Sequence, residues 1–175
     1  MLIWITGLSG AGKTSLVNAL YRLLKPHLPE LVVLDGDVIR SAFGADLGYE
    51  EPDRQVQIRR LQNIAKVLSE QDLVVCVAAL YAHPDLLKWN RENFREYFEV
   101  YLKVTFDTVC RRDAKTLYTK AARGEISDVV GIDIPWHAPA SPDLVLEVDN
   151  PEPPEVLARR VALSVPRLAS LLAGL

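Results

Sequence analysis

The first residues that could do chemistry lie near the N-terminus, where residues 7–14 read GLSGAGKT. This segment matches the P-loop pattern G-x-x-x-x-G-K-[ST], and it lies directly between an apolar segment and a helical pattern, as that motif requires. Its glycines let backbone N–H groups converge on phosphate oxygens, and the following helix N-terminus adds positive potential. The segment therefore predicts a site for nucleotide phosphates. The alternative, a glycine-rich turn with a chance lysine, does not account for its position between strand and helix.

Individual residues of this loop are expected to have separate roles. Lys13 is predicted to reach the β- and γ-phosphates of ATP and to act in catalysis, and the Thr14 hydroxyl is predicted to hold Mg²⁺. The residues expected to bind ATP here are Gly7, Ser9, Gly10, Ala11, Gly12, Lys13, Thr14 and Ser15.

Two carboxylates, Asp35 and Asp37, follow the second apolar segment, where residues 33–37 read VLDGD. Ligands of open α/β sheets bind at the carboxyl ends of the strands, so both carboxylates are expected at the transfer site. One can orient or deprotonate an acceptor hydroxyl and the other can hold Mg²⁺, and the sequence does not tell which does which. Thr14 and Asp35 are the candidate metal ligands. The alternative is a tight turn in which Asp37 caps a helix, a role compatible with catalysis.

A P-loop by itself is shared by kinases, GTPase switches and motor ATPases. The guanine-specific element NKxD is absent from the sequence, and 175 residues are too few for the additional parts of most motor ATPases. Carboxylates beside the loop suit phosphoryl transfer, whereas nucleotide binding alone does not need them. We therefore predict a small-molecule kinase that uses ATP and Mg²⁺. A non-catalytic nucleotide-binding switch or scaffold is the competing hypothesis.

The elements that must position these residues follow from the apolar pattern. Strands are predicted at 2–5, 31–34, 73–78, 98–104 and 144–148, separated by helix-compatible stretches. Near-continuous apolar strands are buried on both faces, which is typical of a parallel sheet covered by helices. The predicted fold class is α/β, a three-layer P-loop NTPase fold with a five-stranded, mainly parallel sheet, helices on both faces and a mobile lid.

Helical spacing and proline positions complete the expected layout, which is a single domain over 1–175. Helices are predicted at 13–24, 52–70 and 84–95, followed by a helix and an irregular lid at about 113–142 and a C-terminal helix at about 153–175. The last helix is expected to break or kink at Pro166, because proline removes a hydrogen bond of the helix.

Composition excludes several classes of partner. The net charge of −3 and the lack of a Lys/Arg block argue against nucleic acid, and no apolar run is long enough to span a membrane. Cys76 and Cys110 lie in or beside apolar segments, so we expect thiols in a reducing, cytoplasmic compartment. The sequence does not determine the oligomeric state, and a homodimer is one option.

The chain resembles the adenylylsulfate kinase family, which uses MgATP to phosphorylate the 3′-hydroxyl of adenosine 5′-phosphosulfate. The resemblance covers about residues 1–150. It rests on the P-loop, LDGDVIR at 34–40, DLGY at 46–49, DR at 53–54, IRR at 58–60, and RDAK, GEI and GID between 112 and 133.

This resemblance implies an acceptor site. Arg40 and Arg54 would contact the acceptor nucleotide, Tyr49 would lie against its base, and Arg112 would bind ATP. A planar guanidinium suits anionic oxygens, and an aromatic ring stacks on a base. The acceptor-binding residues implied are Asp37, Arg40, Tyr49, Arg54, Gln57, Lys115 and Ile132, with Gln57 standing where the family has asparagine.

Several acceptor-side and lid positions depart from the family pattern. The family's Phe-Thr before Gly-Ile-Asp is Val-Val at 129–130, so one ring expected against the acceptor adenine is missing unless Tyr81 or Trp136 replaces it. The sequences WNREN at 89–93 and VVGID at 129–133 look similar to cytidine diphosphoramidate kinases, which also phosphorylate a ribose 3′-hydroxyl. Adenylyl sulfate is the predicted acceptor, and cytidine diphosphoramidate is the alternative.

Overall fold

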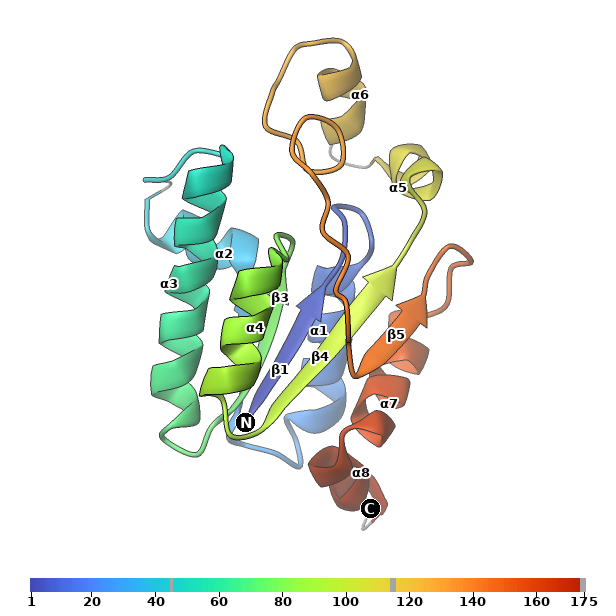
Figure 1. Ribbon diagram of the computed structural model, residues 1–175. Helices are drawn as coiled ribbons and strands as arrows, with labels where there is room; N and C mark the ends of the chain where they lie inside the picture. The colour runs from blue at the N-terminus through green and yellow to red at the C-terminus, as the bar shows by residue number, and fades with distance from the viewer. Residues whose placement is uncertain (45, 114–115, 174–175) are drawn as a thin grey trace.

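A computed structural model describes residues 1–44, 46–113 and 116–173 (Figure 1). Within these residues, five strands form one sheet in the order β2-β3-β1-β4-β5, and every neighbouring pair is parallel. The strands are β1 (Leu2–Thr6), β2 (Leu31–Asp35), β3 (Val74–Ala79), β4 (Tyr97–Lys103) and β5 (Leu144–Glu147). Each strand begins and ends within one residue of its prediction.

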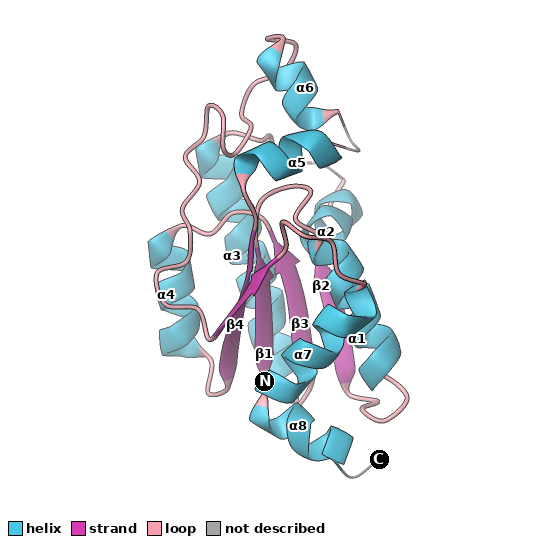
Figure 2. Ribbon diagram, turned by 90° about the vertical axis from the view of Figure 1, so that its right-hand side faces the viewer, coloured by secondary structure: helices cyan, strands magenta, loops and turns pink. Residues whose placement is uncertain are grey.

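Helices cover both faces of the sheet. They are α1 (Lys13–Leu24), α2 (Gly36–Ala42), α3 (Glu51–Ser69), α4 (Pro84–Asn93), α5 (Phe106–Arg112), α6 (Leu117–Ala122), α7 (Pro154–Ser164) and α8 (Pro166–Ala173). Figure 2 shows the sheet between α3 and α4 on one side and α1 and α7 on the other, which confirms the three layers. None of the helices in the described residues is both long and apolar enough to cross a membrane.

The two short helices α2 and α5 were not predicted, because seven residues are too few to display a helical period. The predicted break near the C-terminus is confirmed. Helix α7 ends at Ser164 and α8 begins at Pro166, since proline cannot donate the hydrogen bond that would continue α7.

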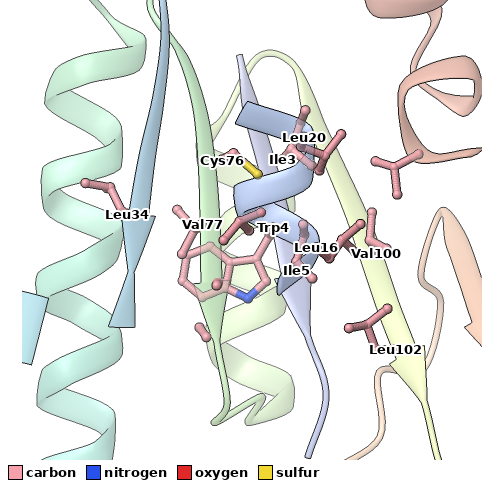
Figure 3. Packing of buried hydrophobic residues seen from close by; sticks show 14 of the residues in the cluster. Ile3, Trp4, Ile5, Leu16, Leu20, Leu34, Cys76, Val77, Val100 and Leu102 are labelled. Carbon is pink, nitrogen blue, oxygen red and sulfur yellow. The ribbon is translucent and has the colours of Figure 1, made fainter. Parts of the chain in front are cut away.

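The core lies between the sheet and its helices. Every residue of β1 and β3 is buried, as expected for central strands covered on both faces. Figure 3 shows Leu16 and Leu20 of α1 beside Ile3, Ile5 and other side chains of the sheet. This packing fixes α1, and with it the P-loop at the N-terminal end of α1.

The lid lies beyond the carboxyl ends of the strands (Figure 1). It consists of α6 followed by a chain without regular structure, in agreement with the predicted helix and irregular segment. Residues 134–143, here called the return segment, lead from the lid back to β5.

The packing of α1 on the sheet makes a testable prediction about stability. Leu16 is 0% exposed, so Leu16→Ala should lower the free energy of unfolding by about 2–5 kcal/mol through lost burial and a cavity. Leu163, which is 52% exposed on α7, is the matched control, and its alanine variant should change that free energy by about 0.5 kcal/mol or less. Urea denaturation measures both. Equal losses in the two variants would contradict this account of the core.

Candidate active site

The loop between β1 and α1 is shaped by glycines that other residues could not replace. Gly12 has φ 99° directly before α1, a left-handed conformation that favours glycine. A Cβ on Gly7 would lie 2.8 Å from the carbonyl oxygen of Leu102. The loop therefore turns tightly against β4 and aims the N-terminus of α1, with its positive end, at the carboxyl edge of the sheet.

A cavity of about 310 Å³ lies on this loop. Of the residues predicted to bind ATP, those that line the cavity are Ser9, Gly10, Gly12, Lys13, Thr14, Ser15 and Arg112. Gly7 and Ala11 do not line it, and both are buried. The Lys13 ammonium donates to the carbonyl oxygens of Gly7 and Leu8 at 2.8 and 2.9 Å, so its side chain arches over the loop.

The Thr14 hydroxyl and the Asp35 carboxylate meet at the edge of this cavity. Thr14 Oγ1 donates to Asp35 Oδ2 at 2.7 Å, although the two residues come from different elements. Hydroxyl and carboxylate oxygens are ligands that suit Mg²⁺, and phosphate oxygens complete its shell in nucleotide sites. No cluster of three or more His, Cys, Asp or Glu side chains able to hold a metal occurs among the described residues, so a protein-only cage is not present there.

The alternative that Asp37 caps a helix is wrong, because Asp35 holds that position. Asp35 has extended backbone angles, and its Oδ1 accepts from Asp37 N at 2.9 Å at the start of α2. Gly36 begins the helix, so Asp37 falls in the first turn, where a carboxylate is favourable next to the helix dipole. Asp35 thus caps α2 through Oδ1 and contacts Thr14 through Oδ2.

A second cavity of about 390 Å³ adjoins the first. Asp37 and Ser9 line both cavities, whereas Asp35 lines only the first. The predicted acceptor-binding residues that line the second cavity are Asp37, Arg40, Tyr49, Arg54 and Gln57. The structure therefore brings these five side chains together, with Asp37 at the boundary between the cavities.

Two buried arginines give the second cavity its positive character. Arg40 and Arg54 are each 9% exposed, and their guanidiniums lie 4.8 and 5.7 Å from the centre of the Tyr49 ring. Arg40 donates to the carbonyl oxygens of Leu47 and Gly48, and Arg54 donates to those of Tyr49 and Asp128. Burial, reinforced by the charge of Arg40, lowers the pKa of Arg54. Since these partners are neutral carbonyls, the site favours an anion.

Two further tyrosines line the cavities: Tyr81, which was considered only as a replacement ring, and Tyr118, which was not predicted as a site residue. Tyr81 lines the second cavity, and its hydroxyl donates to the carboxylate of Glu51. Tyr118 of α6 lines the first cavity and donates to Ser9 O at 3.1 Å. Burial raises the pKa of each to about 12, so both stay neutral at physiological pH. For Tyr118 the sequence offered only an aromatic residue in the lid.

The predicted lid residues have different outcomes. Lys115 lies outside the described residues. Ile132 is 45% exposed on a lid turn and is not among the described residues that line the two cavities. Val129 is buried at 2% exposure, and Trp136 lies against Tyr101 with ring centres 6.1 Å apart. Of the two rings considered as replacements at the acceptor site, Tyr81 is therefore the one placed at the cavity.

The family model described as adenylylsulphate kinase matches residues 1–147. The chain belongs to the adenylylsulfate kinase family. An adenylyl-sulfate kinase of Paraburkholderia xenovorans is 42% identical over 150 residues, which cover 85% of this chain and 84% of the relative. One from Bacillus velezensis is 38% identical over 162 residues, covering 91% and 82% of the two chains.

Solved structures agree with this assignment. The Mycobacterium tuberculosis APS kinase, in complex with AMPPNP and APS, superposes with a TM-score of 0.82 at 34% identity over 98% of this chain and 96% of that one. Shikimate kinase from Aquifex aeolicus, at 18% identity and a TM-score of 0.61, shows the fold alone. The predicted P-loop kinase fold and the resemblance to adenylylsulfate kinases are confirmed.

The geometry around Lys13 and Asp35 predicts large kinetic effects with little loss of stability. Lys13→Ala and Asp35→Asn should each lower kcat by about 10²–10³-fold, because each would remove a charge from the predicted transfer site. Asparagine also caps helices, so Asp35→Asn should keep α2 and leave the melting temperature nearly unchanged. A coupled assay of ADP release measures the rates.

The matched controls for these variants are Lys88→Ala and Asp72→Asn, which change exposed charges remote from both cavities. Both controls should keep the wild-type rate. Near-normal turnover in either Lys13→Ala or Asp35→Asn would show that the transfer site lies elsewhere.

Proposed function

We propose that this chain transfers the γ-phosphoryl group of ATP to the ribose 3′-hydroxyl of adenylyl sulfate, giving 3′-phosphoadenylyl sulfate. The observation that carries the proposal is the position of Asp37 on the wall shared by the P-loop cavity and the arginine-lined cavity. A donor phosphate on the loop and an acceptor beside the arginines would meet at this carboxylate. The relatives named adenylyl-sulfate kinase and the structure with AMPPNP and APS support the same pair of substrates.

On the donor side, the P-loop holds the phosphates of ATP. Lys13 leaves the carbonyls of Gly7 and Leu8 to bind the β- and γ-phosphates, and Arg112, which lines the same cavity, contacts the nucleotide. Thr14 and Asp35 would hold Mg²⁺, which would neutralise charge on the phosphates. The hydrogen bond between Thr14 Oγ1 and Asp35 Oδ2 keeps these two oxygens next to each other.

Asp37 is the group that orients or deprotonates the acceptor hydroxyl. It lines both cavities, whereas Asp35 lines only the first and accepts from the Thr14 hydroxyl. This difference supports Asp35 as the metal ligand and Asp37 as the group at the acceptor. A base must lie within hydrogen-bond reach of the proton that it accepts, and the shared wall is where that proton would lie.

On the acceptor side, Arg40 and Arg54 bind the anionic phosphosulfate, and Tyr49 stacks on the adenine. The ring of Tyr49 is 59% exposed and lies close to both guanidiniums, so it is available to a planar base and already backed by positive charge. Gln57 donates to Gly36 O at 3.1 Å and helps to hold the start of α2 against α3. Lys115 and Ile132 remain acceptor-binding proposals that rest on the family pattern.

The acceptor assignment is tested by comparing substrates and then removing the stacking ring. Adenylyl sulfate should have a far higher kcat/KM than AMP or a cytidine diphosphate derivative, because it supplies both the adenine and the second anionic group. Tyr49→Ala should then raise the KM for adenylyl sulfate about 10- to 100-fold, the loss expected from about 1–3 kcal/mol of base stacking. The KM for ATP should not change.

The matched control is Tyr21→Ala, because Tyr21 is an exposed tyrosine on α1 that lines neither cavity among the described residues. It should leave both KM values unchanged. A preference of the wild-type enzyme for the cytidine compound would contradict the adenylyl sulfate assignment and favour the other branch of the family.

A further inference from the structure

The sequence WNREN at 89–93 on α4 lines neither of the two cavities and needs another explanation. Its arginine, Arg91, faces the end of the return segment. Arg91 Nη1 donates to Asp143 Oδ1 at 3.1 Å, and Nη2 lies 2.9 Å from Asp143 Oδ2. Nη2 also donates to Ser141 O at 2.9 Å. A two-pronged guanidinium–carboxylate pair fixes direction as well as distance, so this contact holds the return segment to α4.

Asp143 is in turn fixed to the edge of the sheet. Its Oδ2 accepts from Glu99 N at 2.7 Å, and its own N–H donates to Glu99 O at 2.9 Å, directly before β5 begins. The carboxylate thus joins α4, β4 and the return segment at one point. Because Asp143 is hydrogen-bonded to both α4 and β4, this end of the return segment is held in place.

A network of buried polar groups adjoins Arg91. Glu99 is 3% exposed and accepts from the Tyr97 hydroxyl at 2.7 Å, and its Oε2 lies 4.0 Å from Arg91 Nη2. Asn90 donates to the same hydroxyl at 3.3 Å and accepts from Gln62 of α3 at 2.8 Å. The network therefore reaches α3, the helix that also carries Arg54.

The upper end of the return segment is tied to the acceptor cavity. Arg54 Nη2 donates to Asp128 O at 2.6 Å, and the Asp133 carboxylate accepts from the N–H groups of Asp128 and Val129, which closes the lid turn just above the return segment. Between the two ends, the chain has neither helix nor strand but contains Pro135, Pro139 and Pro142. Proline fixes φ, so these three positions restrict the conformations of the segment that joins the two ends.

We propose that Arg91 is a positioning residue for the acceptor site. By holding Asp143, it fixes the lower end of the return segment, so that the lid turn presents Asp128 O to Arg54 and keeps that guanidinium aligned with the acceptor cavity. The kinetic part of this inference rests on the proposed function. Arg91 itself touches neither substrate, because among the described residues it lines neither of the two substrate cavities.

Asp143→Asn and Arg91→Lys test the anchor with minimal change of shape. Asparagine keeps an oxygen that can accept from Glu99 N but loses the charge, and lysine keeps the charge but cannot form the two-pronged contact. Each variant should raise the KM for adenylyl sulfate about 3- to 30-fold, the range expected for coupling through a positioning network, and leave the KM for ATP within about twofold. The double variant should have no more effect than either single one.

Hydrogen exchange gives a readout that does not need catalysis. With ADP bound, amides of the lid turn at 126–134 should exchange faster in Asp143→Asn than in the wild-type protein, while those of α1 should not change. The control is Arg160→Lys, which alters another arginine–carboxylate pair, with Glu152, remote from the lid on α7. It should leave both the KM values and the exchange at wild-type levels.

The two hypotheses can fail separately. Failure of the wild-type enzyme to phosphorylate adenylyl sulfate would overturn the proposed function, and the exchange of the lid turn would still decide the role of Arg91. Wild-type KM and wild-type lid exchange in both single variants would overturn the anchor, even if their melting temperatures fell. Additive effects of the two substitutions would overturn it as well.

Discussion

The hydrogen bond between Thr14 and Asp35 is the contact on which the rest of the site depends. It joins the start of α1, which follows β1, to the end of β2. In the sheet, β1 and β2 are separated by β3. Strand pairing sets the level at which they meet, because Ala78 of β3 is paired with Ile5 on one side and with Asp35 on the other. A slip of one residue would turn the carboxylate to the opposite face of the sheet.

The same constraint sets the position of the proposed acceptor site. Because α2 begins directly after Asp35, Asp37 falls one position into its first turn and onto the wall between the two cavities. Arg40 lies near the end of this short helix and is held by backbone carbonyls of the loop that follows it. The P-loop and Asp37 are therefore positioned relative to each other by the turn from β2 into α2, where Asp35 both caps the helix and contacts Thr14.

Much of the fold and part of the site could be predicted from the sequence. Strand ends were placed within one residue because central parallel strands are almost purely apolar, and α1 was placed correctly because the P-loop marks its first residue. Asp37 was placed because it follows a strand end, where parallel topology brings side chains to one edge, whereas Arg40, Tyr49, Arg54 and Gln57 were named only because their motifs resemble those of the family. The strands and the P-loop thus follow from periodicity and topology, and most of the acceptor site follows from the resemblance.

The remaining features depend on tertiary contacts that a linear pattern does not record. Because α2 has only seven residues, the sequence did not show that Asp35, and not Asp37, caps it. In the irregular lid, side-chain direction follows no period, so the sequence could not show that Trp136 turns toward Tyr101 while Tyr81 lines the acceptor cavity. The partner of Arg91 lies 52 positions along the chain, in a segment with no regular structure.

The central claim is that the transferred phosphoryl group arrives on the ribose 3′-hydroxyl of adenylyl sulfate, and the product can show this directly. The purified protein would be incubated with ATP, Mg²⁺ and adenylyl sulfate, and the products would be examined by ³¹P NMR and mass spectrometry. The account predicts one ADP for each molecule of 3′-phosphoadenylyl sulfate, with the new phosphorus coupled to the 3′ position of the ribose. Release of ADP without a phosphorylated nucleotide, or a phosphate at another position, would contradict it.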